Sequence, residues 1–190
     1  MYVGRALFIG SDLSSFLDRH THQVRYKTEQ FVKNSGASRS IDQIVSELSA
    51  QLFVKPLNVN FEDVEKNVVS AKVTVKDFNR EIIIDGARAT RTYPFTGNSD
   101  LFSLKPSTYY SVLPYGDVTQ NRVTIGLEGR PDAEMLKREL DTQEKLLKDY
   151  LANSTTQIEA YNKTIESEIR AVVEHQLKHL KNIDDLKGKL

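Results

Sequence analysis

Apolar residues near the N-terminus recur at three- and four-residue steps, a spacing typical of helices that bury one face. In the first stretch, Asp12 stands where it can cap a helix. In the second, Ser40 and Gln43 fit a capping box ahead of an apolar run that Pro56 ends. The pattern therefore predicts two helices, at about residues 12–33 and about residues 40–53.

The period changes in the middle of the chain. Residues 70–76 and 123–127 alternate between apolar and polar, which is typical of strands with one solvent-facing side. Residues 81–84 form a short apolar run, and Asp85-Gly86 after it reads as a turn before a further strand up to Phe95. Because the gaps are too short for helical crossovers, we expect about three to five strands between residues 66 and 128, mostly antiparallel.

From Pro131 onward, apolar residues again follow helical spacing, with charged and amide side chains between them. The pattern predicts an amphipathic helical arm over residues 131–190, after an α+β domain over residues 1–130. Ala152 to Thr156 are mostly poor helix formers, so we expect two helical segments with a kink or hairpin there. The arm could lie along its own sheet or associate with another chain as a coiled-coil-like segment, and the spacing favours neither. The candidate assembly residues are Leu147, Leu151, Ile158, Tyr161, Ile165, Ile169 and Val172.

Bulk properties narrow the function classes. The 190 residues carry 26 Lys+Arg and 26 Asp+Glu, and this balance gives no general attraction to nucleic-acid phosphates. There is no cysteine, hence no disulfide framework or thiol nucleophile, and no apolar run is long enough to span a membrane. We therefore expect a cytoplasmic protein without membrane association.

Candidate catalytic and metal-binding residues are few. His175 and His179 would share a helix face, but no third ligand is evident nearby, so two solvated histidines are the favoured reading. His20 and His22 are also expected at the surface. No nucleophile elbow, phosphate loop or dinucleotide fingerprint is present. We expect no enzymatic activity, no cofactor and no metal.

The most distinctive stretch mixes aromatic residues, prolines and turn residues between positions 93 and 110. These side chains could form an exposed surface that binds a peptide or stacks on bases. Alternatively, and with more weight, Phe95 and Phe102 fill the core of the sheet while the prolines and Gly97 shape a long connection. The candidate binding-surface residues are Tyr93, Phe95, Asp100, Phe102, Tyr109 and Tyr110.

The same stretch carries a resemblance. Pro94-Phe95-Thr96-Gly97, Leu101-Phe102 and Pro106-Ser107-Thr108-Tyr109 resemble the motif "PFtGd..LF...PSty" in the N-terminal domain of a family of largely uncharacterised bacterial proteins. The segment Ile158 to Asn162, with Arg170 downstream, is similar to that family's helical "I..yN" segment. Longer relatives often continue into a restriction-endonuclease-like domain. The resemblance thus implies a recognition, assembly or regulatory module of a phage-defence system whose nuclease-type effector lies elsewhere.

Three hypotheses result. The leading one is a non-catalytic scaffold or sensor that binds a protein partner, or forms a homo-oligomer, through the helical arm. The second is a nucleic-acid-binding module that uses Arg80, Arg88 and Arg91 together with the aromatic stretch, with affinity that falls steeply as salt rises. The third is a stand-alone hydrolase with an unrecognised site.

Overall fold

The computed structural model describes residues 1–35, 39–77 and 80–189. Within them the chain forms two compact units that interleave along the sequence. Unit 1 comprises Met1–Leu13 and Pro56–Thr155, and unit 2 comprises Ser14–Lys55 and Thr156–Leu190. None of the described helices has a stretch long and apolar enough to cross a membrane.

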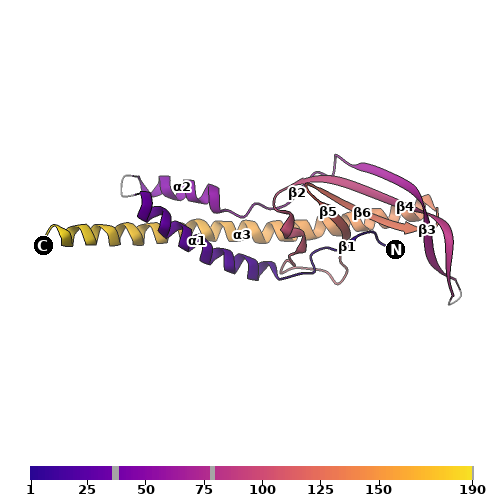
Figure 1. The fold of residues 1–190 in the computed structure, drawn as a ribbon, viewed down its shortest axis with the longest axis horizontal. Helices are drawn as coiled ribbons and strands as arrows, with labels where there is room; N and C mark the ends of the chain where they lie inside the picture. The colour runs from indigo at the N-terminus through magenta and orange to yellow at the C-terminus, as the bar shows by residue number, and fades with distance from the viewer. Residues whose placement is uncertain (36–38, 78–79, 190) are drawn as a thin grey trace. The chain divides into compact units, whose positions relative to one another are not determined.

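Unit 1 is built on an antiparallel sheet of six strands in the order β1-β5-β6-β4-β2, with β3 paired to β4 (Figure 1). The strands are β1 (Arg5–Ala6), β2 (Asn58–Val59), β3 (Glu65–Asp77), β4 (Arg80–Thr96), β5 (Tyr115–Thr119) and β6 (Arg122–Gly129). The α+β class and the antiparallel pairing are confirmed, whereas three to five strands was too few. The additional strands are β1, β2 and β5: β1 and β2 have two residues each, too short to produce a visible alternation, and β5 lies outside the segments that the pattern identified.

β4 corrects a second expectation. Asp85-Gly86 is not a turn, because β4 continues through it and pairs with β3 at Lys72 and Ala71. Glycine is needed at position 86 for close packing: a Cβ there would lie 2.6 Å from Cγ2 of Val73 and 2.5 Å from the carbonyl oxygen of Gly129. Glycine in a strand interior often marks such a close approach, and a turn dipeptide alone could not distinguish the two cases.

The sheet is covered on one face by the first part of α3 (Ala133–Lys187), and a short 3-10 helix, η2 (Ser99–Ser103), contributes to the same core. Aromatic rings join the N-terminal segment to this core, since Phe8 stacks on Tyr150 and contacts Phe102. The largest fully buried side chains of unit 1 are Phe8, Leu13, Tyr93, Leu101, Ile125, Gln143, Leu147 and Tyr150.

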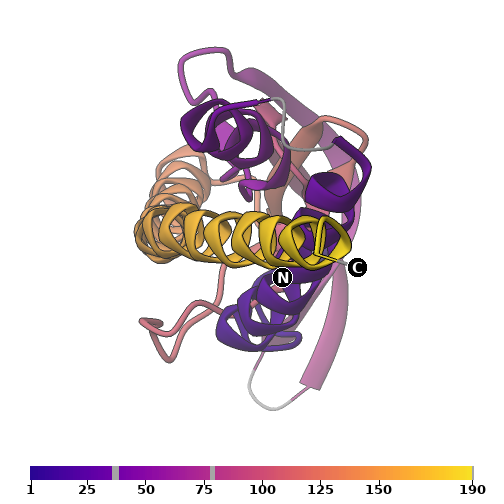
Figure 2. The same ribbon diagram turned by 90° about the vertical axis from the view of Figure 1, so that its left-hand side faces the viewer.

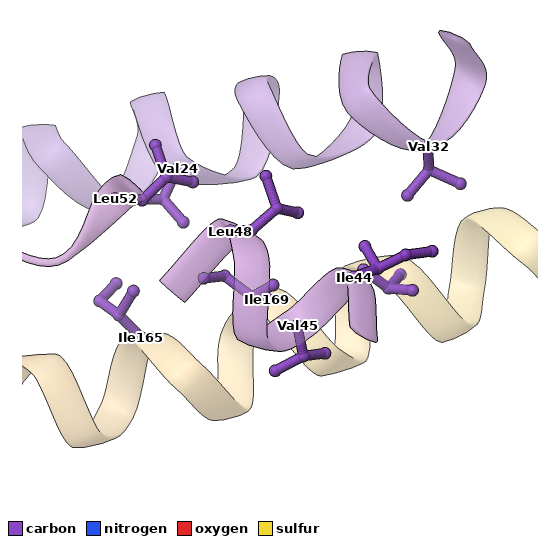
Figure 3. Close-up of a cluster of buried hydrophobic side chains, with 9 residues drawn as sticks. Val24, Val32, Ile44, Val45, Leu48, Leu52, Ile165 and Ile169 are labelled. Atoms are coloured by element: carbon purple, nitrogen blue, oxygen red, sulfur yellow. The ribbon is translucent and has the colours of Figure 1, made fainter. Parts of the chain in front are cut away.

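Unit 2 consists of α1 (Leu13–Ser35, from Ser14 onward), α2 (Ile41–Leu52) and the last part of α3. Figures 1 and 2 show α1 and α2 running alongside this part of α3. The capping box is confirmed: Gln43 N–H donates to Ser40 Oγ at 3.3 Å, and Ser40 N–H donates to Gln43 Oε1 at 3.2 Å. Apolar side chains from all three helices converge between them (Figure 3): Val24, Val32, Ile44, Val45, Leu48, Leu52, Ile165, Ile169 and Val173.

α3 is one continuous helix, so the expected division of the arm into two segments is wrong. The polar residues at the expected break are held by contacts within unit 1. Asn153 Nδ2 donates to the carbonyl oxygen of Thr108 at 3.1 Å, and Ser154 is buried. An ordinary residue is at most about 0.7 kcal/mol less favourable in a helix than alanine. Tertiary contacts of this kind outweigh that difference.

The boundary expected at residues 130 and 131 does not coincide with the boundary between the compact units. The expected boundary lies where the sequence pattern changes from strand to helix. In the structure α3 contributes to both units, because its two parts bury their apolar stripes against different preceding segments. The boundary expected from the sequence pattern therefore marks a change of secondary structure. The boundary between the compact units marks a change in the segments that pack together.

Candidate functional site

The β3–β4 hairpin of unit 1 carries exposed apolar side chains. β4 pairs with β6 through Ala87–Pro94 and with β3 through Arg80–Thr92. Residues 80–86 therefore pair with β3 alone, and the two strands continue as a two-stranded ribbon past the rest of the sheet (Figure 1). A two-stranded ribbon in water is only marginally stable, so a partner that covered it would stabilise it.

Four large apolar side chains of this hairpin are exposed: Val68, Val69, Ile82 and Ile83, which we call the β3–β4 surface. Ile83 is 71% exposed and Val68 is 66% exposed. The register places Val68 and Ile83 on one face and Val69 and Ile82 on the other, so apolar groups emerge on both sides. Among the described residues, β3 pairs with no strand other than β4, which leaves its outer edge open.

Exposed apolar side chains are unusual on a long edge strand whose open side faces only solvent. Such an edge offers unpaired backbone groups to another chain, and proteins normally protect it with charges, bulges or a covering segment. Here Lys66 and Lys72 supply some protection, and Lys72 Nζ is 2.5 Å from Asp85 across the hairpin. The β3–β4 surface combines a free edge with apolar side chains, as surfaces that bind other proteins do.

The candidate nucleic-acid-binding arginines are mostly occupied. Arg88 Nε donates to Glu128 Oε1 at 2.6 Å. Arg91 donates to Asp141 and Glu144, each at 2.7 Å, and its side chain is 13% exposed. Arg80 is exposed and has no ion pair within the described part of the chain. Two of the three guanidinium groups are thus neutralised by carboxylates of their own chain.

Glu144 is the centre of a polar cluster between the sheet and α3. It accepts hydrogen bonds from Arg91 at 2.7 Å, from the Tyr93 hydroxyl at 2.8 Å and from Lys148 at 2.6 Å. Burial would raise the pKa of Glu144, but the hydrogen bonds from Lys148, Tyr93 and Arg91 hold it below its ordinary value. Burial, followed by the hydrogen bond to Glu144, raises the pKa of Tyr93.

This cluster fixes Glu144 as an ionised carboxylate and Tyr93 as a neutral phenol near neutral pH. A general acid or base needs a pKa near the working pH, and these shifts move both groups away from it. The bonds from Arg91 and Tyr93 of β4 instead bind β4 to α3, and Lys148 holds the same carboxylate from within α3. The arrangement favours a structural role.

A groove of about 400 Å³ lies beside α3 on the same face of the sheet. Ala87 and Ala89 of β4 form part of its lining, with Leu136 and Leu140 of α3. We call it the α3 groove. Its further lining residues are Lys66, Asn67, Val68, Thr90, Arg91, Pro131, Ala133 and Lys137.

The candidate binding-surface residues do not share one surface. Tyr93, Phe95 and Phe102 are buried, whereas Asp100, Tyr109 and Tyr110 are exposed. Phe95 and Phe102 pack edge to face with ring centroids 5.0 Å apart, which confirms the prediction that they fill the core. Tyr110 is held to α3, since the Tyr150 hydroxyl donates to its carbonyl oxygen at 2.7 Å.

The candidate assembly residues pack within the chain. Leu147, Leu151, Ile158, Ile165 and Ile169 are buried. Tyr161 and Val172 are half-buried, and the adjacent Val173, not Val172, is the fully buried member of the unit 2 core. The later part of this stripe packs against α1 and α2, a placement different from both the sheet and another chain.

The residues of α3 that resemble the bacterial family's helical segment make specific contacts within unit 2. The Tyr161 hydroxyl lies 2.7 Å from His20 Nδ1 in α1, so His20 is half-buried and not at the surface as expected. The Asn162 amide pairs with the backbone of Val54, accepting from its N–H at 3.1 Å and donating to its carbonyl at 2.9 Å. These residues, with an ion pair between Arg170 and Asp42, attach α3 to the segments before it within unit 2.

His175 and His179 are exposed on α3. Within residues 1–35, 39–77 and 80–189, no group of three or more His, Asp or Glu side chains is placed to hold a metal ion. The described residues therefore offer no metal centre on which to build a mechanism.

The sequence analysis missed the β3–β4 surface, although the chain carries a signal for it. Val68-Val69 and Ile82-Ile83 are apolar doublets, and adjacent residues of a strand point to opposite faces. A doublet in a strand that is solvated on one side must expose one of its members. The short apolar run at residues 81–84 did not reveal this surface, because such a run does not distinguish a buried strand from an exposed ribbon.

No protein-family model, curated protein or solved structure matched the chain in the comparisons made with each. The resemblance of the stretch from Pro94 to Tyr109 to a bacterial family therefore stays a prediction.

Proposed function

We propose that this chain is a non-catalytic recognition or assembly module that presents the β3–β4 surface to another protein chain. The observation that carries the proposal is the coincidence of a free strand edge on β3 with four exposed apolar side chains of the hairpin, two of which, Ile82 and Ile83, lie on its two-stranded part. Burying such side chains releases roughly 25 cal/mol per Å² of apolar area, which rewards a partner that covers them.

The chemistry of the surface favours protein over nucleic acid as the partner. The formal net charge is zero, and Arg88 and Arg91 are held by carboxylates of the same chain. A phosphate backbone would have to compete with those carboxylates, whereas a polypeptide strand can pair directly with the open edge of β3.

The proposed interaction surface lies on the sheet, whereas the sequence pattern suggested the helical arm. The stripe of α3 that the sequence offered for assembly is largely taken up by contacts within units 1 and 2. Our proposal extends to a scaffold or sensor role beside a nuclease-type effector in bacterial phage defence, and this finer part is supported by the sequence resemblance alone.

The test is the mass of the full chain in solution, alone and with any partner that purifies with it from its own cells. Light scattering after size exclusion should give a mass above the 21.6 kDa of one chain. Ile83→Asp places a charge on the β3–β4 surface and should return the mass to that of one chain. Val112→Asp is the matched control, because Val112 is 56% exposed on a loop outside this surface.

Two outcomes would contradict the proposal. One is a partner-free protein of 21.6 kDa at every concentration. The other is an assembly that Ile83→Asp leaves intact, which would place the interface elsewhere. Association with duplex DNA that disappears as salt rises would favour the nucleic-acid alternative instead.

A further inference from the structure

The α3 groove is a second feature of unit 1, and it adjoins the β3–β4 surface at Val68, which belongs to both. Its volume of about 400 Å³ falls within the range of small-molecule sites, roughly 300 to 1,000 Å³. Seven of its twelve lining residues are apolar: Val68, Ala87, Ala89, Pro131, Ala133, Leu136 and Leu140.

The groove owes its depth to small side chains in β4. Ala87 and Ala89 occupy neighbouring positions on the face that α3 covers, and they pair with Gly129 and Leu127 of β6. Large residues at two such positions would fill the space between the sheet and Leu136 and Leu140. With alanine there, an apolar body of small cross-section can lie against the sheet without displacing α3.

The polar lining has one sign of charge. Lys66, Arg91 and Lys137 line the groove, and no carboxylate is among its lining residues. Arg91 is engaged by Asp141 and Glu144, and Lys137 lies 2.9 Å from Asp141. Lys66 is exposed and has no ion pair within the described residues, so its charge is available to a ligand.

We propose that the α3 groove binds an apolar organic anion, with the apolar body against Ala87, Ala89, Leu136 and Leu140 and the anionic head at Lys66. An apolar lining with a few convergent polar groups is the usual composition of a small-molecule site. The free charge of Lys66 sets the charge of the ligand, because a cationic head would be repelled there and the lining has no carboxylate to pair with it. This inference does not depend on the proposed function.

The test uses anilinonaphthalene sulfonate, an apolar anion that fluoresces when it leaves water. The full chain should bind it at one saturable site, and decanoate should displace it. Decylammonium has the same length of alkyl chain with the opposite charge and should displace it far less well.

Two variants assign the site. Lys66→Glu reverses the free charge and should weaken decanoate binding about fivefold. Ala89→Leu fills the groove and should abolish binding of both probes. Lys72→Gln is the control for loss of a cation elsewhere on the same face of β3: Lys72 lies outside the groove lining and is paired with Asp85, so this variant should bind decanoate as the parent chain does.

Three results would overturn the proposal: no saturable binding, equal displacement by decanoate and decylammonium, or binding that Lys66→Glu leaves unchanged. Because Ala89 is buried, Ala89→Leu is interpreted only with an unchanged circular dichroism spectrum. Lys66→Glu changes an exposed side chain and decides the question whatever the fate of the other variant.

Discussion

Replacing Ile169 by alanine removes a side chain from the centre of the unit 2 core. Ile169 is 0% exposed and belongs to the cluster that joins α1, α2 and α3. The same residue is one of those that the sequence offered for association between chains. Ile169→Ala therefore distinguishes a role inside one chain from a role between chains.

The expected cost has two parts. The substitution removes three carbon groups, worth about 0.8 kcal/mol each when buried, which gives about 2.4 kcal/mol. A cavity adds to this, because neighbours on three helices can collapse only in part, and the total should be about 3 to 4 kcal/mol. For a protein of ordinary stability, between about 5 and 15 kcal/mol, this is a large fraction of the whole.

The assay is urea unfolding followed by far-ultraviolet circular dichroism, with hydrogen exchange of α2 as a local measure. The midpoint should fall at unchanged slope, and amides of α2 should exchange faster. Ile183→Ala is the matched control on the same helix. Because Ile183 is 38% exposed and alanine is the better helix former, its effect should stay within about 0.5 kcal/mol.

A cost below about 1 kcal/mol for Ile169→Ala would refute the reasoning, since no buried isoleucine in a closed core is that cheap to truncate. A fall in molecular mass with little change in stability would do so more directly. That result would mean that Ile169 contacts another chain and not α1 and α2.

Two further predictions concern unit 1. Glu144→Gln should destabilise by about 1 to 3 kcal/mol through weaker hydrogen bonds to Arg91, Tyr93 and Lys148. Since the pKa of Glu144 is lowered in the fold, its contribution is fully present above its ordinary value of 4.5 and is lost as the pH falls through the lowered value. Urea titrations across this range should show a smaller pH dependence for the variant, and an equal dependence would contradict the assignment. Gly97→Ala should cost about 1 to 3 kcal/mol, because Gly97 has φ +107° and an added Cβ would lie 2.6 Å from the Pro56 carbonyl oxygen. Gly188→Ala, where the nearest atom would be 3.6 Å away, is its control, and equal melting temperatures for the two variants would remove the argument.

Elements with a strong local signal were predicted well. The capping box at Ser40 and Gln43 gave the start of α2 because both hydrogen bonds lie within one turn. The alternation at Val123, Ile125 and Leu127 identified β6, whose inward side chains are buried. In both cases the residues that form the sequence pattern also make the stabilising contacts.

Elements whose meaning depends on distant residues were predicted poorly. Asp85-Gly86 resembles a turn, yet Gly86 is a glycine because Val73 and Gly129 pack against it. Ala152 to Thr156 resemble a helix break, yet Asn153 bonds to Thr108, 45 residues earlier in the chain. In both cases the contacting residues are too distant along the chain to be recognised from the residues around each segment.

The candidate surfaces show the same limit. The aromatic stretch looked like one site, but burial divides it between the core and the surface. The β3–β4 surface and the α3 groove were not anticipated, because each depends on what other elements leave uncovered. Only the paired register of β3 and β4 shows that Val68 and Ile83 share a face.

The sequence alone determined the long segments, two N-terminal helices, a β region and a C-terminal helical region, since hydrophobic period and capping chemistry act over a few residues. It did not determine the short strands β1, β2 and β5 or the continuity of β4 and α3. It did determine that α3 must bury a continuous apolar stripe. What covers that stripe was decided by the tertiary structure: the sheet over its first part, and α1 and α2 over its last part. The physical reason is that the hydrophobic effect is non-directional. An apolar stripe on a helix therefore requires burial but does not specify which element buries it.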